Sequence, residues 1–336
     1  MNRVVVGVAL LALAVGESLA SEQETAGRPA APRPAIAAIV EAFGQHRIVG
    51  LGDAHGNRLG EAFQLALIAD PGFLAAVDDI VLESGNSRHQ ELADRFIRGE
   101  DVDPAALRRI WLDTTQQQAA SGDVPALFTT VRALNASRPA NRRLRVLLGE
   151  PPIEWENLKT AADYEAWQAK AESSRDGFGA ELIRREVLAK NRRALALYGA
   201  GHFFRKVVDR SMVTLLEGAQ TRVFTIWTNA AFELSSAQAD VRQWPVPSLA
   251  GLRGTTLGRV GFASYLGPNA GDVPAEWLAP MEEQFDAVLY LGPLSTITLD
   301  RPAPWRCDEP AWPERVRRAN LQRPEMGDRL KAQCVP

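Results

Sequence analysis

Two histidines and one acid, each at the end of an apolar run, are the residues best placed to do chemistry. The run before His55 ends as GDAH, and the run before His202 ends as GAGH, so both close in a GxxH pattern. Glu83 ends a third run, Asp79–Glu83. If these runs are neighbouring parallel strands, their carboxyl ends face one crevice. We therefore expect His55, Glu83 and His202 to meet there, with Asp53 beside the first histidine.

Imidazole and carboxylate groups together support two kinds of site. One histidine can act as a general base on water while the other polarises a carbonyl. The same three side chains, His55, Glu83 and His202, can instead hold a divalent cation such as Zn²⁺, Mn²⁺ or Co²⁺ that activates the water. Sequence spacing does not choose between these alternatives.

Four further residues are candidates to support the site. Glu150 ends another apolar run, and His89 follows Glu83 by a few positions, near the expected rim. Arg184 and Asn191 are seven apart on the helix expected before the second GxxH run, hence on one face, where they can orient a site carboxylate. Each also has a structural interpretation: a helix cap or surface acid for Glu150, and solvated helix positions for the other three.

Seven apolar runs of strand length follow one another along the chain, and most are continuous rather than alternating, which is typical of strands buried on both faces. They span residues 46–52, 79–83, 144–149, 194–199, 222–228, 259–265 and 286–292. Glycines interrupt the region around residues 259–265, which fits equally well a loop around a short antiparallel pair.

Helical spacing separates these runs, at residues 60–69, 90–98, 104–110, 124–135 and 180–193. The alternation predicts an α/β fold with a mainly parallel central sheet flanked by helices. Charged residues 154–179 interrupt the alternation and are interpreted as a helical insertion that caps the cleft. We expect a single α/β domain over residues 35–300.

The composition argues against two classes of partner. With 38 Lys and Arg against 41 Asp and Glu, a net charge of −3 and no block of like charges, the chain lacks the surface expected of a nucleic-acid binder. No central apolar run reaches the length of a membrane span. We expect a small-molecule or peptide substrate, and the oligomeric state stays open.

The first twenty residues read as an export signal. Arg3 precedes an apolar stretch, Val4–Val15, and Ala20 ends a pattern that signal peptidase accepts. We expect cleavage after Ala20 and a mature chain, without a membrane span, that is periplasmic or secreted. Residues 21–34 are polar and Ala/Pro-rich, which predicts a flexible lead-in.

The two cysteines lie in the C-terminal tail, residues 301–336. Neither has a histidine or a second cysteine at metal-ligand spacing. In an oxidising compartment we therefore expect a disulfide between Cys307 and Cys334.

The paired GxxH motifs with Glu83 between them, the run IVGLGDAHG, the helix RREVLAKN before ALALYGAGH, and EQFDAVLYLGP together resemble the erythromycin esterase-like superfamily. That group includes the TraB and TIKI proteins and the ChaN-type haem-binding lipoproteins. The resemblance covers residues 46–296 with scattered matches. Asp53 stands where the family usually has Glu, and Leu188 where the esterase helix has Met.

The resemblance implies an α/β core whose cleft holds His55, Glu83 and His202, with Arg184 and Asn191 as the matching helix residues. It favours an exported hydrolase that cleaves an ester, lactone or amide, with a divalent metal in the TIKI branch. The competing hypothesis is a ChaN-like protein that binds haem or iron without catalysis. A catalytically inactive scaffold is the third.

Overall fold

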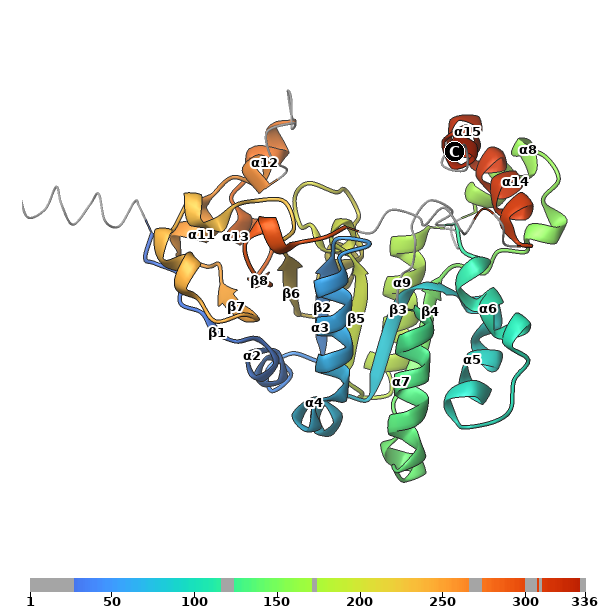
Figure 1. Ribbon diagram of the computed structural model, residues 1–336, viewed down its shortest axis with the longest axis horizontal. Helices are drawn as coiled ribbons and strands as arrows, with labels where there is room; N and C mark the ends of the chain where they lie inside the picture. The colour runs from blue at the N-terminus through green and yellow to red at the C-terminus, as the bar shows by residue number, and fades with distance from the viewer. Residues whose placement is uncertain are drawn as a thin grey trace, which may run out of the picture.

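The computed structural model describes residues 27–115, 124–170, 174–265, 274–299, 307 and 310–332, and these build an eight-stranded sheet in the order β1-β7-β8-β6-β2-β5-β3-β4 (Figure 1). The strands are β1 (Arg33–Pro34), β2 (Ile48–Asp53), β3 (Asp79–Asn86), β4 (Arg145–Glu150), β5 (Ala194–Gly199), β6 (Val223–Thr228), β7 (Ser248–Gly251) and β8 (Ala287–Tyr290). Every pairing from β8 to β4 is parallel, whereas β7 is antiparallel to both of its neighbours. The predicted mainly parallel α/β fold is confirmed.

The continuous apolar runs form strands because helices cover both faces of the sheet. Along β3, Val81 packs into the hydrophobic cluster on one face, while Ile80 and Leu82 pack into the cluster on the other. β5 divides its residues in the same way, with Ala196 on the first face and Leu197 on the second. Apolar side chains at successive positions are therefore all buried.

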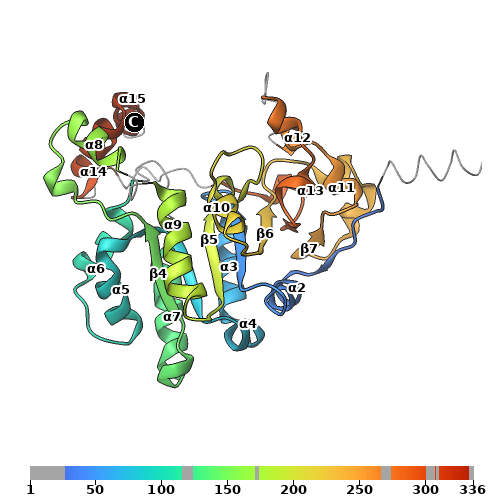
Figure 2. The same ribbon diagram turned by 180° about the vertical axis from the view of Figure 1, so that it is seen from behind.

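One layer of helices lies in front of the sheet in Figure 1 and a second lies behind it, as Figure 2 shows from the back. The first layer contains α2 (Ala35–Ala42), α3 (Arg58–Ala69), α4 (Pro71–Ala76), α5 (Gln90–Ile97), α6 (Pro104–Leu112) and α7 (Val124–Ala136). The second contains α9 (Arg175–Ile183), α10 (Met212–Gly218), α11 (Thr256–Arg259), α12 (Phe262–Tyr265) and α13 (Met281–Gln284). The spacing signals at residues 60–69, 90–98, 104–110 and 124–135 thus correspond to α3, α5, α6 and α7.

The strand predicted at residues 259–265 is wrong. These residues end α11 and form α12, two helices of four residues each. The edge strand that sequence analysis missed is β7, whose four residues follow a proline and pair antiparallel to β8. The alternative of a loop around a short antiparallel pair was closer, because Gly261 forms an isolated antiparallel bridge with Pro280.

Part of the predicted flexible lead-in is ordered. Arg33 and Pro34 form β1 and pair with β7. Ala30 is buried, and its amide donates to the Gln238 side chain at 2.7 Å. This segment therefore completes the edge of the sheet. The predicted signal peptide, residues 1–20, lies outside the described residues.

The predicted cap, residues 154–179, is two separate pieces. α8 (Ala161–Gln168) packs against the C-terminal region, where α14 (Trp312–Gln322) and α15 (Pro324–Ala332) form a hairpin (Figure 1). The remainder of the segment begins α9, which packs on the sheet. The predicted disulfide stays a prediction, because Cys334 lies outside the described residues. No helix in the described part of the chain is long and apolar enough to cross a membrane.

Candidate functional site

His55 lies in the turn between β2 and α3. Gly56, with a φ of +79°, takes the left-handed conformation that this turn requires, and Asn57 caps α3 by accepting from the Gly60 amide. The side chain of His55 is 43% exposed, and its Nδ1 lies 3.1 Å from Asp53 Oδ1. Asp53, two residues before the histidine, therefore lies within ion-pair distance of its ring.

Glu83 lies in β3, beside an irregularity where the pairing with β4 shifts register between Leu82 and Asn86. Such irregularities redirect side chains at the end of a sheet. The carboxylate is 3% exposed, and its Oε2 accepts a hydrogen bond of 2.6 Å from the Gly199 amide at the end of β5. The backbone amide at the end of β5 thus holds the Glu83 carboxylate of the neighbouring strand, β3.

His202 lies in the 3-10 turn Ala200–Phe203 that follows β5. Its Nε2 is 2.9 Å from Glu83 Oε1, and its Nδ1 is 2.9 Å from Asp176 Oδ1. On the other side, His55 Nε2 lies 3.9 Å from Glu83 Oε2. The structure therefore brings the two histidines to opposite oxygens of one carboxylate, as the strand-end argument predicted.

Two residues of this centre escaped sequence analysis: Arg175 and Asp176, at the start of α9. Arg175 pairs with Glu83 and also donates from Nε to Glu150 Oε2 at 3.0 Å. Asp176 accepts from His202 and from the Met212 amide. The only signal was an adjacent Arg and Asp within the segment interpreted as a cap over the cleft.

Glu150 is completely buried at the end of β4. Its Oε1 accepts hydrogen bonds from the amide and the hydroxyl of Thr115, and its Oε2 accepts from Arg175. Burial raises the pKa of Glu150 to about 7, although the Thr115 hydrogen bonds and the charge of His202 act in the opposite direction. Glu150 and Glu83 therefore contact the same guanidinium, that of Arg175.

The other three supporting candidates lie elsewhere. His89 pairs through Nε2 with Asp113 at 3.0 Å. Arg184 donates to the Leu215 carbonyl on the far side of α9. Asn191, with a φ of 54°, lies three residues before β5 begins. It is therefore at the N-terminal end of this strand, whereas Gly199 is at the C-terminal end. The residues that contact Glu83 and His202 come from the beginning of α9, Arg175 and Asp176, rather than from its end.

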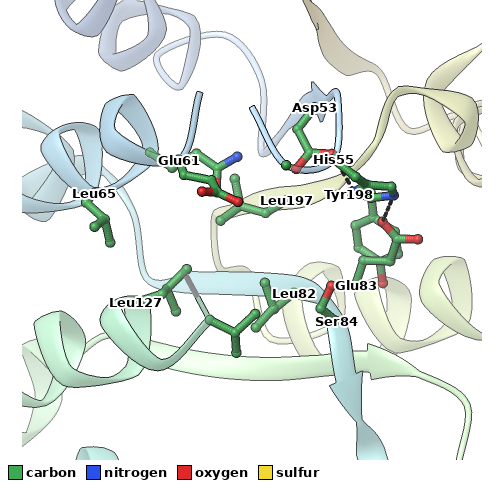
Figure 3. A pocket seen from close by; sticks show the side chains of 13 residues that line it. Asp53, His55, Glu61, Leu65, Leu82, Glu83, Ser84, Leu127, Leu197 and Tyr198 are labelled. Atoms are coloured by element: carbon green, nitrogen blue, oxygen red, sulfur yellow. Dashed lines mark ion pairs between the residues drawn. The ribbon is translucent and has the colours of Figure 1, made fainter. Parts of the chain in front are cut away.

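An open pocket of about 550 Å³, partly continuous with solvent, adjoins this centre (Figure 3). Asp53, His55 and Glu83 line its polar side. Its other side is apolar and lies between α3, α7 and the sheet; the lining residues there are Leu65, Leu82, Val124, Leu127 and Leu197. Glu61 of α3 is a further acidic lining residue.

The side chains at the centre do not fit the divalent metal that remained an alternative. Among the described residues, no group of three or more His, Cys, Asp and Glu side chains is arranged to hold an ion. Glu83 Oε1 already contacts His202 and Arg175, and both nitrogens of His202 face carboxylates. A guanidinium cation therefore lies where an ion would bind.

Haem fits no better. A haem site needs an accessible axial ligand over a broad apolar surface. All four tyrosines of the chain are buried, and the pocket offers the single exposed ligand His55 beside three acids.

No protein-family profile and no curated protein matches the sequence.

Solved structures of similar arrangement include the following three. A Bacillus cereus protein is 12% identical over 82% of this chain and 97% of its own, with a TM-score of 0.48. A mutant of the erythromycin esterase EreC in its open conformation is 12% identical over 78% of this chain and 94% of its own, with a TM-score of 0.45. ChaN of Campylobacter jejuni, a protein with cofacial heme binding, is 10% identical over 57% of this chain and 84% of its own, with a TM-score of 0.36. At such identities the likeness concerns the fold alone.

Proposed function

We propose that the protein is an exported hydrolase that cleaves an ester, lactone or amide with water activated by His55. The observation that carries this proposal is the Asp53–His55 pair at the mouth of the pocket. Asp53 Oδ1 lies 3.1 Å from Nδ1 of the ring, within ion-pair distance, and both residues line the pocket. An acid that orients one ring nitrogen so that the other can accept a proton is the arrangement of a general base.

In the proposed reaction, His55 Nε2 takes a proton from water as the water oxygen attacks the acyl carbon. The leaving oxygen or nitrogen then receives that proton from His55 as its bond to the acyl carbon breaks. Asp53 stabilises the imidazolium formed between the two steps. Glu83 lies 3.9 Å from Nε2 and adds a second negative charge near it.

His202 takes a positioning role in this proposal. Both of its nitrogens are occupied by Glu83 and Asp176, and it does not line the pocket. It therefore acts through Glu83 rather than on the substrate carbonyl, the role that sequence analysis considered for one of the two histidines.

The apolar side of the pocket supports an uncharged acyl group as the part of the substrate bound there. Leu82, Leu127 and Leu197 are each less than a tenth exposed, so the space among them suits a hydrocarbon chain or ring. The carboxylates on the polar side disfavour anionic acyl groups. Export through a signal ending at Ala20 remains part of the proposal.

A panel of chromogenic esters, lactones and amides tests the proposal, with the variants His55→Ala, Asp53→Asn and His46→Ala. His46 precedes β2 at the other edge of the sheet and serves as the matched control. We expect kcat to fall by about 100-fold or more in His55→Ala and Asp53→Asn, and to change little in His46→Ala.

Haem titration of the same proteins distinguishes the competing function. A Soret shift that His55→Ala abolishes, together with no turnover of any substrate, would replace the hydrolase with a ChaN-like haem-binding protein. Turnover that survives in His55→Ala would remove the proposed base.

A further inference from the structure

We propose that Arg175 is the fixed cation of this site: it holds Glu83 and Glu150 in place and occupies the position that a divalent ion would otherwise take. For its activity measurements this inference rests on the proposed hydrolase, whereas its metal-binding measurements do not.

Although no group of three or more His, Cys, Asp and Glu side chains among the described residues is arranged to hold an ion, two pairwise distances here are near those between metal ligands. Two ligands of a tetrahedral Zn²⁺ at ~2.1 Å lie roughly 3.4 Å apart. His202 Nε2 is 2.9 Å from Glu83 Oε1, and His55 Nε2 is 3.9 Å from Glu83 Oε2. Small shifts of these side chains would satisfy an ion, so ligand spacing alone does not exclude one.

In this proposal, the guanidinium of Arg175 is what keeps a divalent ion out of the site. It donates from Nε to Glu150 at 3.0 Å and contacts Glu83 through a terminal nitrogen. Glu83 is 3% exposed, so its charge needs a nearby cation, and the same guanidinium donates a hydrogen bond to the buried Glu150. An arginine fills this need permanently, because it keeps its proton in proteins and cannot dissociate as an ion does.

The start of α9 delivers this cation. Ser174 caps the helix by accepting from the Gly177 amide, and the next residue, Arg175, points back to the ends of β3 and β4. Asp176 then reaches His202. Arg175 does not line the pocket, so it acts through Glu83, which makes it a positioning residue.

The decisive experiment is calorimetric titration of the untagged full chain with ZnCl₂. We compare the wild type with Arg175→Met, which keeps an unbranched apolar side chain in place of the methylene part and removes the guanidinium charge, and with Arg185→Met as the matched control. Arg185 is 60% exposed on the continuation of the same helix and pairs only with Glu186 among the contacts of the described residues. We expect Arg175→Met to bind one Zn²⁺ at least about 100-fold more tightly than the wild type or Arg185→Met, and to lose that binding when His202→Ala is added.

Two results would overturn the inference. One is stoichiometric Zn²⁺ binding by the wild type that His55→Ala or His202→Ala abolishes. The other is no gain of Zn²⁺ binding in a folded Arg175→Met protein, since Arg175 would then not be what keeps the ion out.

A second variant covers a failure of Arg175→Met to fold, which circular dichroism detects. Arg175→Gln keeps hydrogen-bond donors without the charge, and we expect the same gain of Zn²⁺ binding. If neither variant folds, the imidazole NMR signals of the wild type decide: perturbation of the His55 and His202 signals by Zn²⁺ overturns the inference, and unchanged signals support it.

Activity adds an independent readout. Arg175→Lys keeps the charge, and we expect it to retain kcat within about tenfold of the wild type, whereas Arg175→Met loses about 100-fold with little change in KM. Equal losses in the two variants would contradict a role for the charge. If the wild type cleaves no substrate, the proposed function fails, and the zinc titration still tests Arg175.

Discussion

At the scale of single residues, the two glycines of the second GxxH motif, Gly199 and Gly201, differ in what they do. A Cβ placed on Gly199 would lie 2.8 Å from His55 Nε2 and 3.6 Å from Glu83 Oε2. A Cβ on Gly201 would meet nothing within 4 Å. The first glycine is therefore required by the close approach of the His55 ring, whereas the second is not. The sequence alone does not show which of the two glycines in GAGH is needed for a close contact.

This difference predicts that Gly199→Ala lowers kcat at least about tenfold while Gly201→Ala leaves it within about twofold. The added methyl group displaces the half-exposed ring of His55, which can rotate toward solvent, so we expect both variants to keep a melting temperature near that of the wild type. Steady-state kinetics on the best ester substrate and thermal melts check the pair. Equal activity in the two variants would show that His55 does not depend on this contact.

At the scale of elements, the strand ends and the starts of α5, α6 and α7 were predictable, whereas the start of α9 was not. His55, Glu83 and His202 follow continuous apolar runs, whose burial on both faces fixes where each strand ends. Arg175 and Asp176 sit in a charged segment with no such periodicity, and only the path of α9 along the sheet brings them back to the strand ends. The helical spacing at residues 180–193 covers only the second half of α9 and the chain that leads into β5. It therefore pointed to Arg184 and Asn191, which lie toward the N-terminal end of β5, away from the site.

The C-terminal hairpin connects to the site through a chain of buried contacts. Gln322 of α14 donates to the Thr115 carbonyl at 2.8 Å, and Thr115 in turn donates to Glu150. Arg318 of the same helix pairs with Asp113 at 2.8 Å. Burial alone would raise the pKa of Asp113, but hydrogen bonds and charges from His89, Arg318 and Arg109 outweigh it and lower the pKa to about 2.

We therefore predict that Arg318→Ala destabilises the protein by about 3 kcal/mol at pH 7, because it leaves a nearly buried carboxylate with fewer partners. Lys331→Ala, which removes an exposed pair with Asp328, should change stability by less than about 0.5 kcal/mol. The folded-state pKa of Asp113 lies below its unfolded value, so the contribution is complete above pH 4 and is lost as the pH falls toward 2. Urea denaturation at pH 7 and pH 3 measures both variants; similar values for the two would mean that the hairpin is not held by this pair.

At the scale of the whole molecule, the sheet order explains why the sequence revealed the fold better than the site. β2, β5 and β3 are adjacent in the sheet although β5 comes more than 100 residues after β3 in the chain. The three continuous runs were enough to predict a parallel sheet with a common edge. Which side chains meet at that edge depends on strand order and on crossover helices, and a single sequence carries no local mark of either.

The buried acid behind the site makes the stability of the whole molecule depend on pH. The pKa of Glu150 is raised to about 7 in the folded state and lies near 4.5 in the unfolded chain, so between these values the folded protein holds a proton that the unfolded chain has released. Stability should therefore fall as the pH rises from 4.5 to 7 and level off above 7, with a slope of order 1 kcal/mol per pH unit from this group. Glu150→Gln lacks this titration, so we expect its free energy of unfolding, relative to that of the wild type, to increase over the same window. Chemical denaturation at half-unit pH steps measures the difference. A difference that stays constant with pH would mean that the ion pair with Arg175 keeps Glu150 ionised throughout, because a permanently charged carboxylate exchanges no proton on unfolding in this range.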